Sequence, residues 1–132
     1  MIFRPLVFLG AESEPAARAS LAAGRQNRLW NYVDVFYRNQ GQENSGYVTD
    51  DFLRDIGGDV SGLNVSRLMT DKDDETATKQ LTEASALADR FQIEGTPTFL
   101  INRRGQSPKE LGFQQLSPDE FTAAIDSELG GG

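Results

Sequence analysis

The chain has 132 residues, enough for one domain with a modest core, and its 38% hydrophobic and 25% charged content predicts a folded globular protein. The formal net charge of −7 argues against nucleic-acid binding, which needs clustered Lys and Arg, and we interpret the acidity as a source of solubility. Cys and His are both absent, which excludes disulfides, thiolate catalysis, a histidine general base and Cys/His zinc sites.

Residues 2–9 are an apolar run and form the first predicted strand. We do not interpret this run as a signal peptide, because it lacks a basic start and a cleavage pattern. Pro5 indicates an edge position or a bulge in that strand. A helix is predicted to begin near Ser13 and to continue through the Ala-rich residues 16–23. No apolar stretch approaches the roughly 20 residues of a membrane-spanning helix, so we expect no membrane partner.

The next predicted helix carries apolar side chains at helical spacing. They are Leu29, Trp30, Val33, Phe36 and Tyr37. We expect Trp30 and Phe36 to lie in the core, because an aromatic stripe on a helix is more often buried than part of a ligand groove. Tyr32 lies off this stripe, and we expect it to be exposed.

Three more helices are predicted before residue 92. Thr49 is expected to cap the first of them, and the Gly-Gly pair at 57–58 ends it. A short helix follows, and then a longer one that begins in the acidic stretch 71–75, where carboxylates suit the positive end of a helix dipole. This acidic stretch has Thr at the positions where an EF-hand loop needs Gly and Glu, so we interpret it as a helix start.

The C-terminal part predicts a β-hairpin, with strands at residues 98–101 and near 110–113. The turn between them holds Arg103-Arg104-Gly105, and we interpret the two arginines as a solvated hairpin tip rather than an anion site. A final helix has the clearest local signal, because Ser117 is a typical N-cap and Glu120 completes a capping box. No internal repeat or linker is visible, so we assign one domain over residues 1–132.

Residues 93–102 carry a Gly-Thr-Pro turn that leads into an apolar β run, and this block resembles the cis-proline strand of thioredoxin-fold proteins. Together with Phe3-Arg4-Pro5-Leu6, the Ala-rich helix and Leu29-Trp30, it is similar to the DsbA-like thioredoxin family. The resemblance implies a thioredoxin-like, three-layer α/β fold that is mostly helical with a small mixed sheet and is incomplete at its N-terminal end. It also implies a helical insertion at about 27–92, followed by a C-terminal hairpin and helix at 97–129.

The resemblance further implies a thiol–disulfide oxidoreductase or isomerase, in which one thiolate attacks a disulfide and a second resolves the mixed disulfide. This chain has no cysteine, so we expect no catalytic residue, no metal or other cofactor, and no activity of the chain alone. Our first hypothesis is a Cys-free portion of such an enzyme, in which Thr96 and Pro97 face an extended peptide or thiol protein substrate. The alternatives are a non-catalytic peptide-binding or interaction module and, less favoured, a small-molecule site at the same loop.

The family's first strand has no counterpart here, and its loss is expected to leave a vacant strand edge. We expect residues 2–9 either to pair with residues 98–101 or to form a homodimer with a second chain, rather than to stay loose. Full burial of each large apolar side chain in this segment is worth roughly 1.5–3 kcal/mol. The chain carries no address label, and the family works in the periplasm or the cytoplasm.

Overall fold

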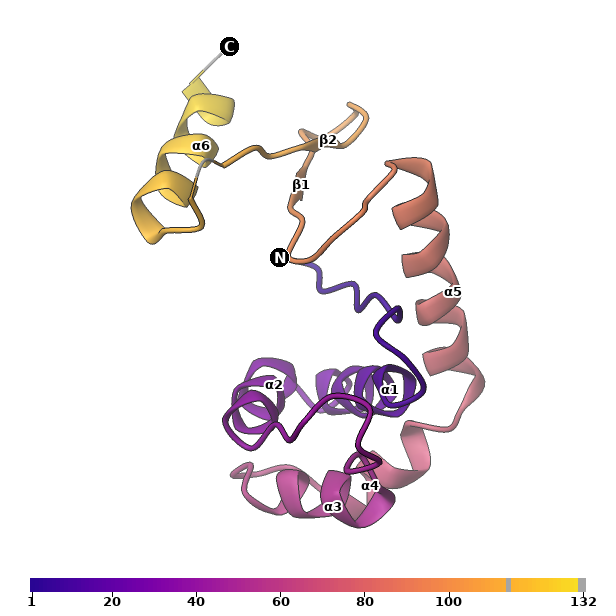
Figure 1. The fold of residues 1–132 in the computed structure, drawn as a ribbon. Coiled ribbons are helices and arrows are strands. Elements are labelled where there is room, and N and C mark those ends of the chain that lie inside the picture. The colour runs from indigo at the N-terminus through magenta and orange to yellow at the C-terminus, as the bar shows by residue number, and fades with distance from the viewer. Residues whose placement is uncertain (114, 131–132) are drawn as a thin grey trace. The chain divides into compact units, whose positions relative to one another are not determined.

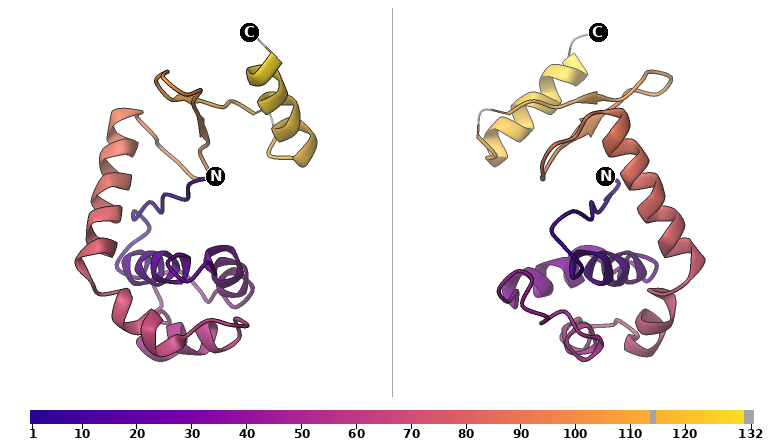
Figure 2. Two further views of the ribbon diagram at one scale, coloured as in Figure 1. Left: turned by 180° about the vertical axis from the view of Figure 1, so that it is seen from behind. Right: turned by 45° about the vertical axis from the view of Figure 1, so that its right-hand side comes forward.

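The structure, a computed structural model, describes residues 1–113 and 115–130, and the chain divides into two units, Met1–Gln92 and Ile93–Gly132. The helices of the first unit are α1 (Ser13–Gly24), α2 (Leu29–Arg38), α3 (Asp50–Gly58), α4 (Val65–Asp71) and α5 (Glu75–Arg90) (Figure 1). The elements of the second unit are β1 (Leu100–Ile101), β2 (Lys109–Glu110) and α6 (Pro118–Gly130) (Figure 2). The predicted order of helices, hairpin and final helix is therefore present.

Side-chain caps explain where three helices of the first unit begin. Thr49 Oγ1 accepts a hydrogen bond from the N–H of Phe52 at 3.2 Å, as predicted for α3. Asn64 caps α4 in the same way, and Asp74 caps α5 by accepting from the N–H of Ala77 at 3.0 Å. The acidic stretch is thus a helix start, as its sequence indicated.

The core of the first unit lies around α1, whose small side chains allow close approach of α2, α4 and α5 (Figure 1). Its fully or nearly fully buried members are Ala19, Ala22, Ala23, Tyr32, Leu53, Ile56, Val60 and Leu68. Tyr32 has no exposed surface, and its Oη donates to the backbone oxygen of Leu53 at 3.2 Å. Burial without a charged partner raises the pKa of the Tyr32 phenol, so this side chain stays neutral.

The prediction for α2 was wrong at two positions. Tyr32 is buried, whereas Trp30 is 50% exposed and packs edge-on against Phe3 with ring centroids 5.5 Å apart. The α2 helix contacts both α1 and α3. The face of α2 that is buried against the core therefore carries Tyr32, Val35 and Phe36. Phe36 packs against the core as predicted, and the Tyr32 hydroxyl finds a backbone acceptor inside it.

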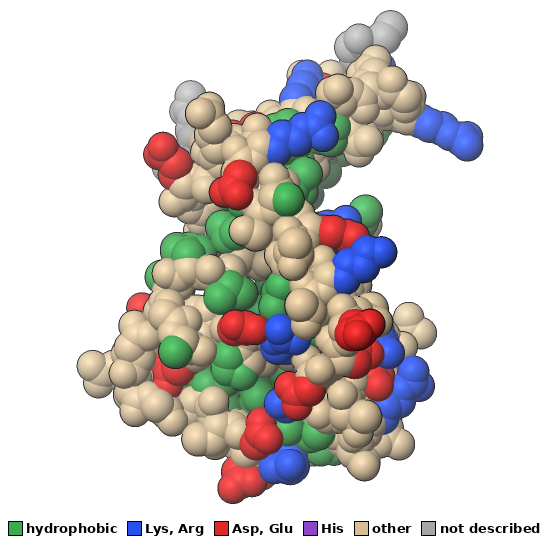
Figure 3. Space-filling view, turned by 90° about the vertical axis from the view of Figure 1, so that its right-hand side faces the viewer, with side chains coloured by type: hydrophobic (Ala, Val, Ile, Leu, Met, Phe, Trp, Pro, Cys, Tyr) green, Lys and Arg blue, Asp and Glu red, His purple; other side chains and the backbone are tan. Residues whose placement is uncertain are grey.

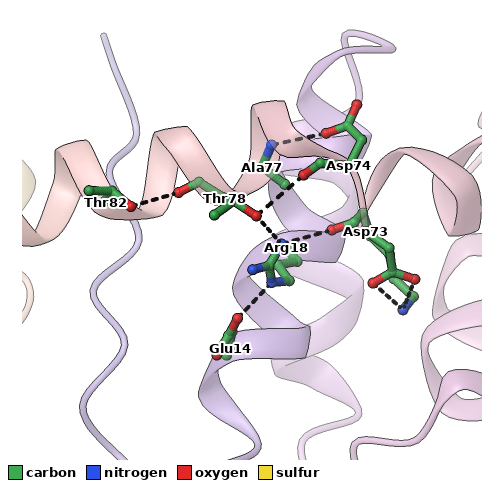
Figure 4. Close-up of polar contacts among 8 residues, drawn as sticks. Glu14, Arg18, Asp73, Asp74, Ala77, Thr78 and Thr82 are labelled. Atoms are coloured by element: carbon green, nitrogen blue, oxygen red, sulfur yellow. Dashed lines mark hydrogen bonds and ion pairs between the residues drawn. The ribbon is translucent and has the colours of Figure 1, made fainter.

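Hydrogen bonds and ion pairs link α1 to the start of α5 (Figure 4). Arg18 donates to Glu14 within α1 at 2.8 Å and to Thr78 Oγ1 of α5 at 3.1 Å. Arg25, which follows α1, forms an ion pair with the capping residue Asp74. The N–H of Ala77 and then the Arg25 guanidinium lower the pKa of Asp74, so its contribution to stability is present at neutral pH and is lost as the pH falls through that lowered value.

Residues 2–9 do not form the predicted strand. The sheet of the described residues contains β1 and β2 alone, so the expected pairing of residues 2–9 with residues 98–101 is absent. The other elements of the first unit are helices, whose backbone groups bond internally, and the segment has no strand beside it to complete a ladder. Side-chain contacts attach residues 2–9 to the helices instead. The Phe3 ring packs edge-on against Trp30, and Arg4 forms an ion pair with Glu83 at 3.2 Å.

Two adjacent glycines at the end of α3 provide a matched test of this packing. A Cβ at Gly57 would lie 3.0 Å from Cδ2 of the fully buried Leu68, whereas one at Gly58 would meet no atom within 4 Å. We expect Gly57→Ala to lower the free energy of unfolding by about 1–2 kcal/mol, because overpacking outweighs the gain in helix propensity. Gly58→Ala should leave it unchanged or raise it by up to about 1 kcal/mol. Urea denaturation followed by circular dichroism measures both, and equal midpoints would contradict the packing described.

Candidate substrate-binding loop and strand edge

The Gly-Thr-Pro turn lies at the surface of the second unit and leads into β1. Thr96 and Pro97 are both exposed, and the peptide bond between them is cis. Thr98 follows, and its Oγ1 donates to the backbone oxygen of Gly95 at 2.7 Å. This side-chain hydrogen bond closes the turn. Thr96 and Pro97, the two residues predicted to bind substrate, therefore lie together on one exposed loop.

The register of the hairpin determines which backbone groups of β1 are used within the sheet. The strands are antiparallel, with Leu100 opposite Glu110, and the N–H of Leu111 donates to the oxygen of Phe99 at 2.8 Å. In an antiparallel ladder, residues that exchange hydrogen bonds alternate with residues whose backbone groups point outward. The backbone N–H and C=O groups of Phe99 and Ile101 therefore point toward β2, whereas those of Leu100 point away from it.

The outward-pointing backbone groups of β1 belong to Thr98, Leu100 and Asn102. Neither Thr98 nor Asn102 makes a backbone–backbone hydrogen bond within residues 1–113 and 115–130. On β2 the equivalent outward positions are Pro108, Glu110 and Gly112, of which only proline has no N–H to donate. The exposed loop leads directly into β1.

A tight turn carries two arginines at the far end of β1. The N–H of Gln106 donates to the oxygen of Arg103 at 2.9 Å, and Gly105 has a φ of +85°, as a type II turn requires at its third residue. Arg104 is exposed and Arg103 is half-buried. Within the part of the chain that the structure describes, neither arginine side chain has a carboxylate partner.

Three phenylalanines hold the hairpin against α6. Phe99 and Phe113 come from the hairpin and the segment after it, and Phe121 lies in the first turn of α6. Ring centroids are 5.0 Å apart for Phe99 and Phe121 and 5.6 Å apart for Phe113 and Phe121. An ion pair between Lys109 and Glu128, at 2.7 Å, adds a second link between β2 and α6. This small cluster therefore supports one face of the hairpin.

The start of α6 agrees with the prediction at Ser117 and differs from it at Glu120. Ser117 Oγ accepts a hydrogen bond from the N–H of Glu120 at 3.3 Å, as an N-cap does. The Glu120 carboxylate accepts from the N–H of Gln115 at 2.9 Å, two residues before the position that a capping box uses.

A shallow depression of about 460 Å³ lies in the first unit and is lined by Arg54, Val65, Ser66, Met69 and Thr70. No three acidic side chains gather into a metal-binding group within residues 1–113 and 115–130. In the same residues no helix combines the length and the apolar character needed to cross a membrane.

Sequence reasoning placed Thr96 and Pro97 correctly at the mouth of a strand but missed two features around them. The hydrogen bond from Thr98 Oγ1 to the Gly95 oxygen could have been predicted, because Thr hydroxyls often form hydrogen bonds with backbone groups within turns. Which residues of β1 point their backbone groups away from β2 could not have been assigned, because this depends on the hairpin register.

Comparison with known proteins gives the same fold. The sequence matches the DSBA-like thioredoxin domain family over residues 1–126. It is 26% identical over 131 residues to disulfide bond formation protein D of Bacillus subtilis (strain 168), and the match covers 98% of this chain and 56% of that protein. The chain therefore spans little more than half the length of this curated relative.

Two solved structures are similar to this one. A thioredoxin-like oxidoreductase from Silicibacter pomeroyi DSS-3 gives a TM-score of 0.72 at 24% identity, covering 96% of this chain and 66% of its own. Oxidised BdbD from Bacillus subtilis gives 0.70 at 23% identity, covering 95% and 65%. These similarities confirm the predicted thioredoxin-like, DsbA-like fold, with six helices and a two-stranded sheet in the described residues.

Proposed function

Because this chain belongs to the DSBA-like thioredoxin domain family, we propose that it is the substrate-facing, Cys-free portion of a thiol–disulfide oxidoreductase. Thiol–disulfide exchange needs an attacking thiolate and a resolving one, and this sequence provides neither. Its contribution is to bind the extended peptide on which such an enzyme acts. The assignment of one domain over residues 1–132 remains a prediction within this proposal.

The observation that carries the proposal is the exposed loop at Thr96 and Pro97, which the hydrogen bond from Thr98 Oγ1 to the oxygen of Gly95 closes. An extended peptide beside this loop would gain main-chain hydrogen bonds from Thr96, which makes no backbone–backbone hydrogen bond within residues 1–113 and 115–130. Such a site binds backbone and tolerates many side chains, which suits an enzyme that acts on varied unfolded proteins.

N-methylated peptides test this binding mode without altering the protein. A short extended peptide, unmodified or N-methylated at alternate residues in either of the two registers, is titrated into the isotopically labelled chain. We expect N-methylation in one register to abolish binding and in the other to preserve it, because alternate N–H groups of a strand face the same way. Amide shifts of Thr96 and Thr98 report the site. Equal binding in both registers would exclude strand addition at this loop.

A non-catalytic binding module is the second candidate, and the complete absence of cysteine favours it. Both candidates use the same loop, so the peptide titration does not separate them. The nucleotide sequence upstream of the Met1 codon does. A Cys-x-x-Cys about one strand and a turn upstream supports the oxidoreductase portion, and its absence supports the binding module.

A homodimer through the β1 edge is a further part of the proposal. A second copy presents the same extended segment, and two edge strands are mutually complementary in their hydrogen-bonding groups. Sedimentation equilibrium during the peptide titration would then show a dimer that dissociates as peptide binds. A monomer at every concentration, or a dimer that peptide leaves intact, contradicts this arrangement.

A further inference from the structure

The side chain of Thr98 bridges the two residues that the proposed function assigns to the substrate. Its Oγ1 donates to the backbone oxygen of Gly95 at 2.7 Å, so the bond joins the residue before Thr96 to the residue after Pro97. Within residues 1–113 and 115–130 no other group donates to that oxygen, and Thr96 makes no hydrogen bond. In this part of the chain, the Thr98 hydroxyl alone therefore holds the Gly95 carbonyl in place.

The position of the Gly95 carbonyl determines where the N–H of Thr96 points. The C=O of one residue and the N–H of the next lie in one rigid peptide plane, and in a trans peptide they point in opposite directions. The cis bond of this turn is the following one, between Thr96 and Pro97. Because Thr98 Oγ1 binds the Gly95 oxygen, the N–H of Thr96 points away from the Thr98 hydroxyl.

Gly95 supplies no restraint of its own to this peptide plane. It carries no side chain, and a Cβ built on it would meet no atom within 4 Å. Glycine visits more backbone conformations than any other residue, so a turn that contains it needs another contact to fix its geometry. Loss of the Thr98 hydroxyl would therefore let the plane between Gly95 and Thr96 rotate.

Charged groups do not provide another means of orienting a ligand at this turn, because residues 95–102 carry no charged side chain. The basic residues of the second unit are Arg103, Arg104 and Lys109, and Figure 3 shows basic side chains projecting from this unit in the upper part of the view. A peptide at the turn is thus oriented by backbone hydrogen bonds, which weaken steeply when the N–H is misaligned.

Resting on the proposed function, we infer that Thr98 is a positioning residue for the peptide ligand. Its hydroxyl fixes the peptide plane between Gly95 and Thr96, and this plane presents the Thr96 N–H to the peptide backbone. The Thr98 side chain does not itself bind the ligand, because its donor is already used within the turn. The side chain that follows Pro97 therefore sets the affinity and the register of the bound peptide.

Two substitutions at position 98 test this role in the full chain, with the unmodified and N-methylated peptides as ligands. Thr98→Val keeps the shape of the side chain and removes the donor, whereas Thr98→Ser keeps the donor. We expect Thr98→Val to bind the unmodified peptide about three- to tenfold more weakly, which is the contribution of one neutral hydrogen bond. It should also discriminate less between the two N-methylated registers. Thr98→Ser should bind within about twofold of the unsubstituted chain.

The motion of the Thr96 amide without ligand separates positioning from direct contact. We expect the heteronuclear NOE of this amide in the free chain to fall in Thr98→Val and to be retained in Thr98→Ser. A second substitution, Gly95→Ala, restrains the backbone of the turn by another route. Added to Thr98→Val, it should recover about two- to fivefold of the lost affinity.

Thr122→Val is the matched control for removing a threonine hydroxyl. Thr122 Oγ1 donates to the backbone oxygen of Pro118 at 2.8 Å, within α6 and outside the turn. Its substitution removes the same kind of hydrogen bond from the same unit, and peptide affinity should stay unchanged. Equal weakening by Thr122→Val and Thr98→Val would show a general effect on the unit and would overturn the positioning role.

The other outcomes separate this inference from the function on which it rests. If the unsubstituted chain binds peptide and Thr98→Val binds it equally well, the inference is wrong and the proposed function stands. Weaker binding without a change in the Thr96 amide, or without recovery by Ser at position 98 or by Gly95→Ala, also overturns the inference. If the unsubstituted chain binds none of the peptides, the proposed function is wrong and the inference with it.

Discussion

Replacing Tyr32 with alanine is expected to lower the free energy of unfolding by about 3–5 kcal/mol, a large part of the stability of a domain of this size. Tyr32 has no exposed surface and lies in the cluster where α1, α2 and α3 meet. Its ring occupies space that Ala19, Ala22 and Leu53 cannot fill without moving their helices. Chemical denaturation followed by far-ultraviolet circular dichroism measures the change.

Two control substitutions show how much of the stability lost in Tyr32→Ala comes from burial of the ring, rather than from its hydrogen bond or from losing an aromatic residue anywhere in α2. Tyr32→Phe keeps the ring and removes the hydroxyl that donates to Leu53, so it should cost about 0.5–1.5 kcal/mol. Trp30→Ala removes a larger ring from the same helix, yet Trp30 is 50% exposed, and we expect a loss of about 1 kcal/mol. A larger loss for Trp30→Ala than for Tyr32→Ala would mean that the buried stripe of α2 is wrongly assigned.

Phe121→Ala is expected to abolish peptide binding by releasing α6 from the hairpin. Phe121 contacts both Phe99 and Phe113, so its removal breaks two of the three ring contacts in this cluster. We expect a local loss on the order of 2 kcal/mol or more. A two-stranded hairpin is marginally stable without a covering element, so the β1 edge should lose its order as well. Amide dispersion of residues 93–130 and the peptide dissociation constant report the outcome.

Leu129→Ala is the matched control for this experiment. Leu129 lies in the last turn of α6 and is 67% exposed, so truncating it removes an apolar side chain that supports nothing. The change in stability should stay within about 0.5 kcal/mol, and peptide binding should persist. If Leu129→Ala and Phe121→Ala weaken binding equally, the ring cluster is not what holds the strand edge in place.

The local features of the chain were predictable because they depend on neighbours in the sequence. Thr49 and Ser117 each stand just before a helix and bond a backbone N–H three residues later, which is a property of the residue type and its position. The turn before Gln106 needs a residue that accepts positive φ, and Gly105 supplies it. The position of Thr96 and Pro97 before an apolar strand followed from the same kind of local pattern.

Predictions that needed a neighbour distant in the sequence were less reliable. The sequence of α2 offers apolar side chains on more than one face, and only contact with α1 and α3 decides that Tyr32 rather than Trp30 is buried. Residues 2–9 have strand-like composition, but a strand exists only where another backbone lies beside it. The described elements of the first unit are all helices, and Ile2 and Phe8 are 78% and 51% exposed.

Local sequence was enough to place the helix starts and the hairpin, to reveal the family resemblance and to show that no thiol is available for exchange. The register of β1 against β2 and the burial of Tyr32 rather than Trp30 came from the folded chain. Helix caps and turns are satisfied within a few residues, whereas a ladder register and a buried face are settled by partners that local sequence does not specify.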